Sequence, residues 1–194
     1  TSVLPDVETY SVEGTPADSI ILALSKLLED KIDMVISGAN QGFNLGDDVL
    51  ISGTVGAALQ GYLRGFPALA ISVAAANSPY MANAARLAAL LARRIDSNTL
   101  PANIFFNINL PDLPASEIKG LMITELAHKS HIVSVDEGHD GRREYYWLVR
   151  QKMNKNTDMG TDIWAIEQGN ISITPLHSAL YNRPSPTITD SLCS

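Results

Sequence analysis

The sequence predicts an α/β fold in which helices cover both faces of a mostly parallel sheet, a three-layer sandwich. Segments with the apolar pattern of strands alternate with segments of helical periodicity through the first two thirds of the 194 residues. The segment 68–73 is an apolar run, typical of a parallel strand covered on both faces. With 45% hydrophobic residues and no break in composition, residues 1–194 are expected to form a single domain.

The first elements are predicted by their end signals. Residues 10–12 have the pattern of a short strand, which Gly14 ends. Thr15 is suited to cap a helix, and Asp18 completes a spacing like that of a capping box. Apolar residues then recur with helical period, so we expect a helix to about residue 30, followed by a strand over residues 33–36.

The middle of the chain continues the alternation. A helix that opens after Ser52 ends near Gly65, and the strand 68–73 follows it. A helix over about residues 81–95 then precedes a strand over residues 103–109. This order of elements is what predicts the layered α/β architecture.

The last third changes character. Residues 121–124 and 144–149 are β-like and are joined by a long polar segment that contains Asp140 and Gly141, so we predict an extended hairpin. We expect it to protrude as an arm over about residues 120–150. Residues 171–174 return as a strand, and the tail after Pro175 forms a C-terminal extension.

A loop rich in glycine and asparagine follows the strand at residues 33–36. Residues 37–48 are Ser-Gly-Ala-Asn-Gln-Gly-Phe-Asn-Leu-Gly-Asp-Asp, and residues 52–55 are Ser-Gly-Thr-Val. Backbone N–H groups and neutral amides in such a loop, next to a helix N-terminus, suit an anion such as phosphate. The candidate phosphate-binding residues are Asn44, Ser52, Gly53 and Thr54.

The sequence of this loop closely resembles the signature of the SurE family, the metal-dependent survival-protein-E nucleotidases. Residues 12–18, 159–162 and 171–176 resemble further landmarks of that family in the same order. The resemblance implies a Rossmann-like, mostly parallel sheet and an activity on nucleoside monophosphates, as a 5'/3'-nucleotidase. It also implies that Asn40 supplies an oxygen to one divalent metal ion, Mg²⁺ or Mn²⁺, because a carboxamide oxygen suits these cations.

One departure from the family pattern concerns the metal site. The family opens with an Asn-Asp-Asp-Gly turn after its first strand, and this sequence, which begins at Thr1, has no such turn. We therefore expect a preceding strand-helix-strand unit of about 30 residues, with two metal-binding aspartates and a serine, to lie outside it. No catalytic residue is identified in the sequence itself.

Each candidate also has a structural interpretation. The Asn40 side chain could bond only the loop backbone, and Ser52 could act only as a helix N-cap. Asp47 and Asp48 are more plausibly capping or orienting residues than metal ligands. Four histidines, His128, His131, His139 and His177, receive no site role, since no His-Glu-x-x-His arrangement is present.

Composition excludes several classes of function. The net charge of −7 argues against binding a nucleic-acid polymer and repels a free phosphate ester, so a cation is expected at any phosphate-cleaving centre. No apolar run is long enough to span a membrane. Cys193 is the only cysteine, which indicates a reducing, cytoplasmic location.

The leading hypothesis is a metal-dependent phosphatase that hydrolyses nucleoside monophosphates. The alternatives are a phosphate-binding or assembly module without the metal carboxylates and a sugar-phosphate-binding domain of another α/β family. Tyr145, Tyr146 and Trp147 lack a cover on a protruding arm, so we expect a homodimer or tetramer in which a second subunit covers them.

Overall fold

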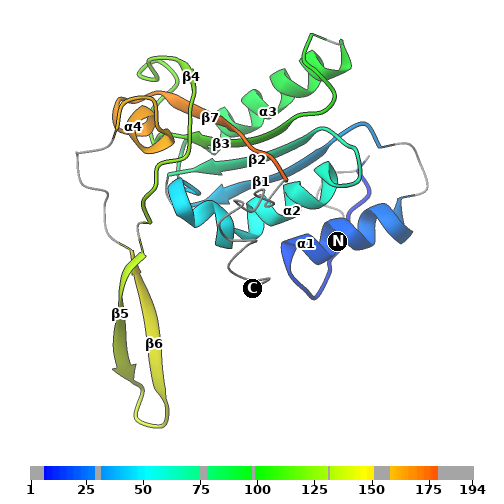
Figure 1. The fold of residues 1–194 in the computed structure, drawn as a ribbon. Helices are drawn as coiled ribbons and strands as arrows, with labels where there is room; N and C mark the ends of the chain where they lie inside the picture. Colours follow the sequence, from blue (N-terminus) through cyan, green and yellow to red (C-terminus); the bar gives the residue numbers. More distant parts are fainter. Residues whose placement is uncertain are drawn as a thin grey trace, which may run out of the picture.

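The computed structural model describes residues 7–28, 32–74, 78–97, 99–130, 132–150 and 158–178. Within these ranges a five-stranded sheet carries helices on both faces, and a separate two-stranded hairpin projects from it (Figure 1). The predicted three-layer α/β sandwich is confirmed.

The sheet is mixed and mostly parallel. Its strands lie in the order β1-β2-β3-β7-β4. They are β1 (Val35–Gln41), β2 (Ala68–Val73), β3 (Phe105–Leu110), β7 (Ile171–Pro175) and β4 (Leu121–Ile123). The pairs β1–β2, β2–β3 and β4–β7 are parallel, whereas β3 and β7 are antiparallel.

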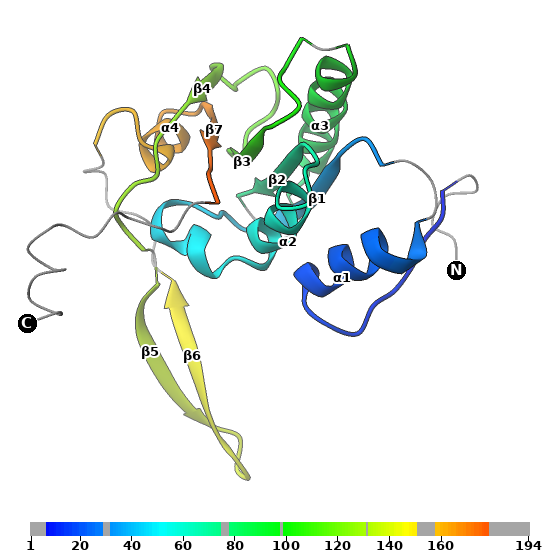
Figure 2. The ribbon, with the colours of Figure 1, turned by 45° about the vertical axis from the view of Figure 1, so that its right-hand side comes forward.

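The helices form the outer layers. They are α1 (Pro16–Leu22) with its π-helical continuation η1 (Ala23–Leu27), the 3₁₀ helix η2 (Gly46–Ile51), α2 (Gly53–Tyr62), α3 (Met81–Asp96) and α4 (Asp162–Glu167). In both ribbon views α3 lies on one side of the sheet and α2 on the other, with α1 packed outside α2 (Figure 2). Among the described residues, no helix has the length and apolar content needed to cross a membrane.

Strand β2 is the centre of the core. Its alternate side chains Leu69 and Ile71 pack with Leu91 of α3, while Ala68 and Ala70 pack with α2. All six of its residues are buried, as expected of a strand covered on both faces.

Three N-terminal predictions are corrected. Residues 10–12 do not form a strand, because their backbone pairs with no described strand. Strand β1 begins at Val35 and continues to Gln41, so Asn40 lies within the strand instead of in the loop after it. The predicted capping box is present, with Asp18 N donating to Thr15 Oγ1 and Thr15 N donating to Asp18 Oδ2, but the helix ends at Leu27.

The predicted hairpin exists with a different partner strand. Strand β6 (Glu144–Arg150) pairs with β5 (Ile132–His139), and the earlier strand β4 joins the main sheet instead. The arm therefore spans residues 132–150 and not about 120–150. Its turn contains Gly141 at φ +89° and is held by Asp140 Oδ1, which accepts the backbone N–H groups of Arg142 and Arg143, both at 2.8 Å.

Candidate functional site

A bulge in β1 aims the asparagine of the motif. Ser37 pairs with Ala70 and Asn40 with Ser72, so β1 has one residue more than β2 between these pairs. Gly38 adopts φ +125° there, and a Cβ on it would lie 2.3 Å from a backbone carbonyl oxygen of β2. Such a bulge redirects the following side chain. It brings Asn40 into register with Ser72, on the sheet face that α2 covers.

The structure brings the predicted site residues together in one pocket of about 280 Å³. It is lined by Pro16, Asn40, Gln41, Phe43, Asn44, Ile51, Ser52, Gly53 and Thr54. The end of β1, the loop after it, the end of η2 and the first turns of α1 and α2 thus meet at one place. All five residues predicted to bind phosphate or metal are present, although their roles stay predictions.

The two polar side-chain atoms of Asn40 differ in their hydrogen bonding within the described residues: Nδ2 has a partner and Oδ1 has none. Its Nδ2 donates to the carbonyl oxygen of Gly42 at 2.8 Å, which fixes the orientation of the amide. Among the described residues none donates to its Oδ1. The bond to the loop backbone that the structural interpretation predicted is therefore present, and it leaves the oxygen for a ligand.

The N-terminus of α2 provides the donors for an anion. Ser52 is its N-cap, and Ser52 Oγ accepts the N–H of Val55 at 3.2 Å. The N–H groups of Gly53 and Thr54 come first in the helix and have no intrahelical acceptor. Gly53 also permits α1 to approach, because a Cβ there would lie 3.1 Å from the Pro16 side chain.

Asn44 lines the pocket, but most of its polar groups face the sheet. It is 8% exposed, and its Nδ2 donates to Ser72 Oγ at 2.7 Å. Its carbonyl oxygen accepts from Asn107 Nδ2 at 2.8 Å and Asn109 Nδ2 at 2.9 Å, and Asn109 Oδ1 accepts its N–H. These bonds make Asn44 the anchor of the loop on β3, and its phosphate contact stays a prediction.

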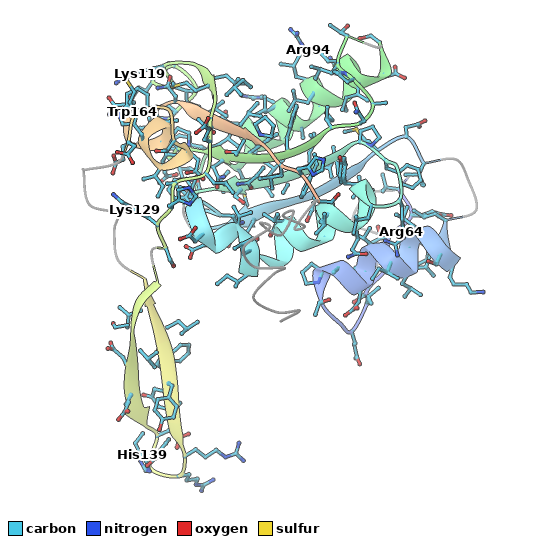
Figure 3. The ribbon with its side chains drawn as sticks, in the orientation of Figure 1. Arg64, Arg94, Lys119, Lys129, His139 and Trp164 are labelled. Atoms are coloured by element: carbon cyan, nitrogen blue, oxygen red, sulfur yellow. The ribbon has the colours of Figure 1, made fainter. Side chains whose placement is uncertain are left out.

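Asp47 and Asp48 do not line this pocket. Asp47 is exposed, and its backbone N–H donates to the carbonyl oxygen of Lys129 at 3.0 Å. Asp48 is buried, and its carboxylate accepts the hydroxyl of Ser130. Figure 3 places Lys129 beside this loop, near the root of the arm. Asp48 thus makes a contact through its side chain and Asp47 through its backbone, and the capping or orienting role of both stays a prediction.

Sequence reasoning missed the buried polar groups that support the loop. Asp162 is fully buried and accepts the Gly46 N–H at 2.8 Å, although it lies 116 residues further along the chain. Burial raises the pKa of its carboxyl, against the opposing effect of its backbone N–H donors. Asn107 and Asn109 could have been found from a simpler signal, since both interrupt an otherwise apolar strand.

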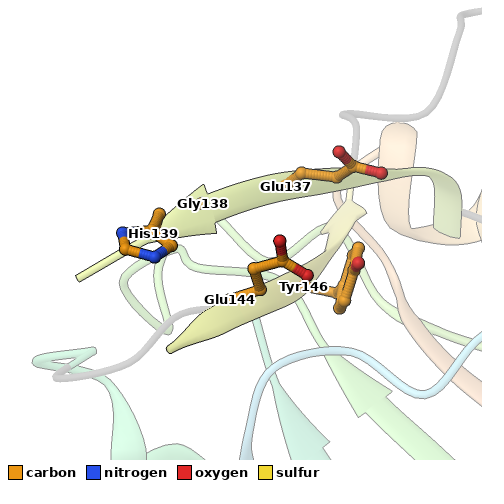
Figure 4. Close-up of a pocket in the computed structure, with 5 residues that line it drawn as sticks. All are labelled: Glu137, Gly138, His139, Glu144 and Tyr146. Atoms are coloured by element: carbon orange, nitrogen blue, oxygen red, sulfur yellow. The ribbon is translucent and has the colours of Figure 1, made fainter. Parts of the chain in front are cut away.

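The histidines contribute no described contact to the pocket. His128 and His139 are exposed, and His131 and Cys193 lie outside the described residues. A second hollow, of about 330 Å³, lies on the arm and is lined by Glu137, Gly138, His139, Glu144 and Tyr146 (Figure 4). Within the described ranges no group of three or more His, Cys, Asp or Glu side chains could hold a metal ion.

Comparison with known proteins decides the family. A family model described as "Survival protein SurE" matches residues 2–132. The chain belongs to the SurE family. A SurE relative from Dehalococcoides mccartyi (strain CBDB1), named 5'-nucleotidase SurE, is 51% identical over 97% of this chain and 72% of its own. The protein of the same name from Legionella pneumophila (strain Paris) is 45% identical over 87% of this chain and 67% of its own.

A solved SurE structure shares the fold. The SurE protein from Aquifex aeolicus superposes with a TM-score of 0.75 at 32% identity, over 94% of this chain and 74% of that one. The resemblance to the SurE signature in the sequence is thus confirmed, and so is the α/β fold that it implied.

Proposed function

We propose that this SurE protein is a metal-dependent phosphomonoesterase that hydrolyses nucleoside monophosphates to nucleoside and phosphate. The observation that carries the proposal is the convergence of Asn40, Ser52, Gly53 and Thr54 on one pocket. The relatives named 5'-nucleotidase support the nucleotide as substrate.

The phosphate would lie at the start of α2. The N–H groups of Gly53 and Thr54 would donate to its oxygens, and the partial positive charge of the helix N-terminus favours an anion there. These donors are fixed before substrate arrives, because Ser52 caps the helix and Asn44 anchors the preceding loop. Fixed donors can stabilise charge that develops on the phosphoryl oxygens during reaction.

The oxygen chemistry of the pocket fits a hard cation. Asn40 Oδ1 would be a ligand, since its amide nitrogen is committed to Gly42. As far as the structure describes the lining, it contains no carboxylate, so Asn40 would supply one neutral ligand of a larger set. A divalent cation, when bound, would neutralise phosphoryl oxygens and lower the pKa of a bound water.

The apolar side of the pocket suits the nucleoside. Phe43 and Ile51 also line it, and Ile51 is 69% exposed. An aromatic ring and an exposed aliphatic chain offer contact area to a base or ribose that inorganic phosphate lacks. This arrangement favours a phosphate ester with an organic group over free phosphate.

Metal dependence gives the first test. The protein, expressed at its natural full length, is expected to release inorganic phosphate from a nucleoside monophosphate in Mg²⁺ or Mn²⁺, and excess chelator should abolish release. An acidic chain needs a cation to hold a phosphate ester, which is the physical reason. Restoring the metal is the control, and unchanged turnover in excess chelator would refute the mechanism. Phosphate binding without turnover under all metals would favour the non-catalytic module instead.

The arm offers a surface for a second subunit. Tyr145, Tyr146 and Trp147 are 41%, 60% and 65% exposed. The rings of Tyr145 and Trp147 pack edge to face, with their centroids 5.9 Å apart. The alternation of β6 places Tyr146 on the opposite face of the hairpin from the other two. A two-stranded hairpin has no core of its own to bury such side chains. A second copy of the chain would cover them in a homodimer or tetramer.

Deletion of the arm tip tests this assembly. Removing residues 134–143 is expected to shift the mass measured by light scattering toward the monomer, while circular dichroism of the α/β sandwich is kept. The physical reason is that the deletion removes most of β5, the strand whose pairing with Tyr145, Tyr146 and Trp147 holds these side chains in place as one surface. Leu90→Ser, which changes an exposed apolar residue of α3, is the control and should leave the mass unchanged. An unaltered oligomer after the deletion would exclude the arm from the interface.

A further inference from the structure

The buried carboxylate of Asp162 joins three segments of the chain. Asp162 begins α4, directly after the N-cap Thr161. Its Oδ2 accepts the N–H of Gly46 at 2.8 Å, and its Oδ1 accepts the N–H groups of Ala127 at 3.0 Å and Ile163 at 2.8 Å. Hydrogen bonds to a carboxylate are stronger than those between neutral groups. One side chain therefore holds the start of η2, the segment before the arm and its own helix.

Further contacts tie the same two segments together. Asp47 N donates to Lys129 O at 3.0 Å, and the Ser130 hydroxyl donates to the Asp48 carboxylate. Gly46 packs so closely that a Cβ on it would lie 2.2 Å from the Lys129 carbonyl oxygen. Residues 46–48 thus rest on residues 127–130 and have little room to shift.

The supported segment leads directly to the pocket. Asn44, two residues before Gly46, lines the pocket. The helix η2 runs from Gly46 to Ile51 and is followed directly by Ser52, the N-cap of α2. A displacement of Gly46 would therefore move the loop on one side and the cap of α2 on the other. Asn44 is already held by β3, so Gly46 is the second fixed point of the loop.

We propose that Asp162 is a positioning residue of the phosphate pocket, which holds Gly46 and thereby sets the placement of Asn44 and Ser52. It touches no substrate and acts through the loop alone. Residues 125–130 lead into the arm, so the same carboxylate also ties the segment before the arm to the site. The activity readout of this proposal rests on the proposed function, whereas its structural readout does not.

Asp162→Asn is the sharpest test. The amide keeps the size of the side chain but presents one donor where two oxygens accepted three N–H groups, so the bond to Gly46 cannot form alongside the others. Hydrogen–deuterium exchange of residues 43–48 is expected to accelerate about tenfold, while α3 exchanges at its normal rate. The kcat/KM for a nucleoside monophosphate should fall about tenfold, mainly through a higher KM, because the phosphate donors are misplaced.

A matched variant separates positioning from general destabilisation. Leu91→Ala shortens a buried side chain and leaves a cavity in the core between α3 and the sheet, away from the loop. It is expected to lower the melting temperature without changing kcat/KM. If Asp162→Asn does not fold, Ser130→Ala, at an exposed position, removes the neighbouring contact with Asp48 and should accelerate exchange of residues 46–48 by about threefold.

The outcomes are distinguishable. The proposal is overturned if residues 43–48 exchange at the wild-type rate in Asp162→Asn and in Ser130→Ala. It is also overturned if Leu91→Ala lowers kcat/KM as much as Asp162→Asn does. If the wild-type protein releases no phosphate, the proposed function fails, and the exchange pattern still decides whether Asp162 positions the loop.

Discussion

Asn40→Ala is expected to lower turnover on a nucleoside monophosphate by about 100-fold and to weaken the binding of Mn²⁺. The substitution removes Asn40 Oδ1, a pocket-lining side-chain oxygen that accepts no hydrogen bond from the described residues. The fold should remain, because the only bond lost is the one to Gly42, which costs no more than about 1.5 kcal/mol. Steady-state kinetics and metal titration measure the effect, and circular dichroism checks the fold.

Asp47→Asn is the matched control for this prediction. Asp47 lies in the same loop, but its side chain is exposed and outside the pocket. Its described hydrogen bond is made by the backbone N–H, which donates to the Lys129 carbonyl oxygen and is kept in the variant. Turnover and metal affinity are expected to change less than about twofold. If Asp47→Asn had the larger effect, the metal would lie on the other side of the loop and Asn40 would be only a structural residue.

Gly46→Ala is expected to destabilise the protein by at least about 3 kcal/mol and to lower the melting temperature by roughly 10 °C. Gly46 has φ +54°, and an added Cβ would lie 2.2 Å from Lys129 O and 2.7 Å from Ala127 O. Both atoms are backbone, so neither can rotate away. The loop must move to relieve the contact, so phosphate binding should be lost together with stability.

Gly56→Ala controls for the loss of a glycine as such. Gly56 lies inside α2, and a Cβ there would meet nothing within 4 Å. The change should stabilise the protein by about 0.5–1 kcal/mol, because alanine loses less backbone entropy in a helix. Differential scanning calorimetry compares the two variants. A Gly46→Ala protein that melts within about 2 °C of the wild type would contradict the tight packing of the loop.

Local chemistry in the sequence determined the layers and most of the site. The capping box of Thr15 and Asp18, and the apolar run of β2, depend on neighbours in the chain and on burial, and both predictions are confirmed. The resemblance to the SurE signature also pointed to Asn40, and the loop that runs into a helix start pointed to the Ser-Gly-Thr turn as an anion site. The pocket that unites them could thus be predicted.

The tertiary structure alone decided features that depend on distant segments. Strand β1 extends past Gly38 because β2 pairs with it through a bulge. Strand β6 pairs with β5, whereas β4 pairs with β7 in the main sheet. Strand β5 contains polar residues such as Asp136 and Glu137, so it lacks the alternating apolar pattern from which a strand is predicted. Asp162 reaches Gly46 across 116 residues. No local pattern encodes such a contact, because the energy of a buried hydrogen bond is set by what the fold places opposite it.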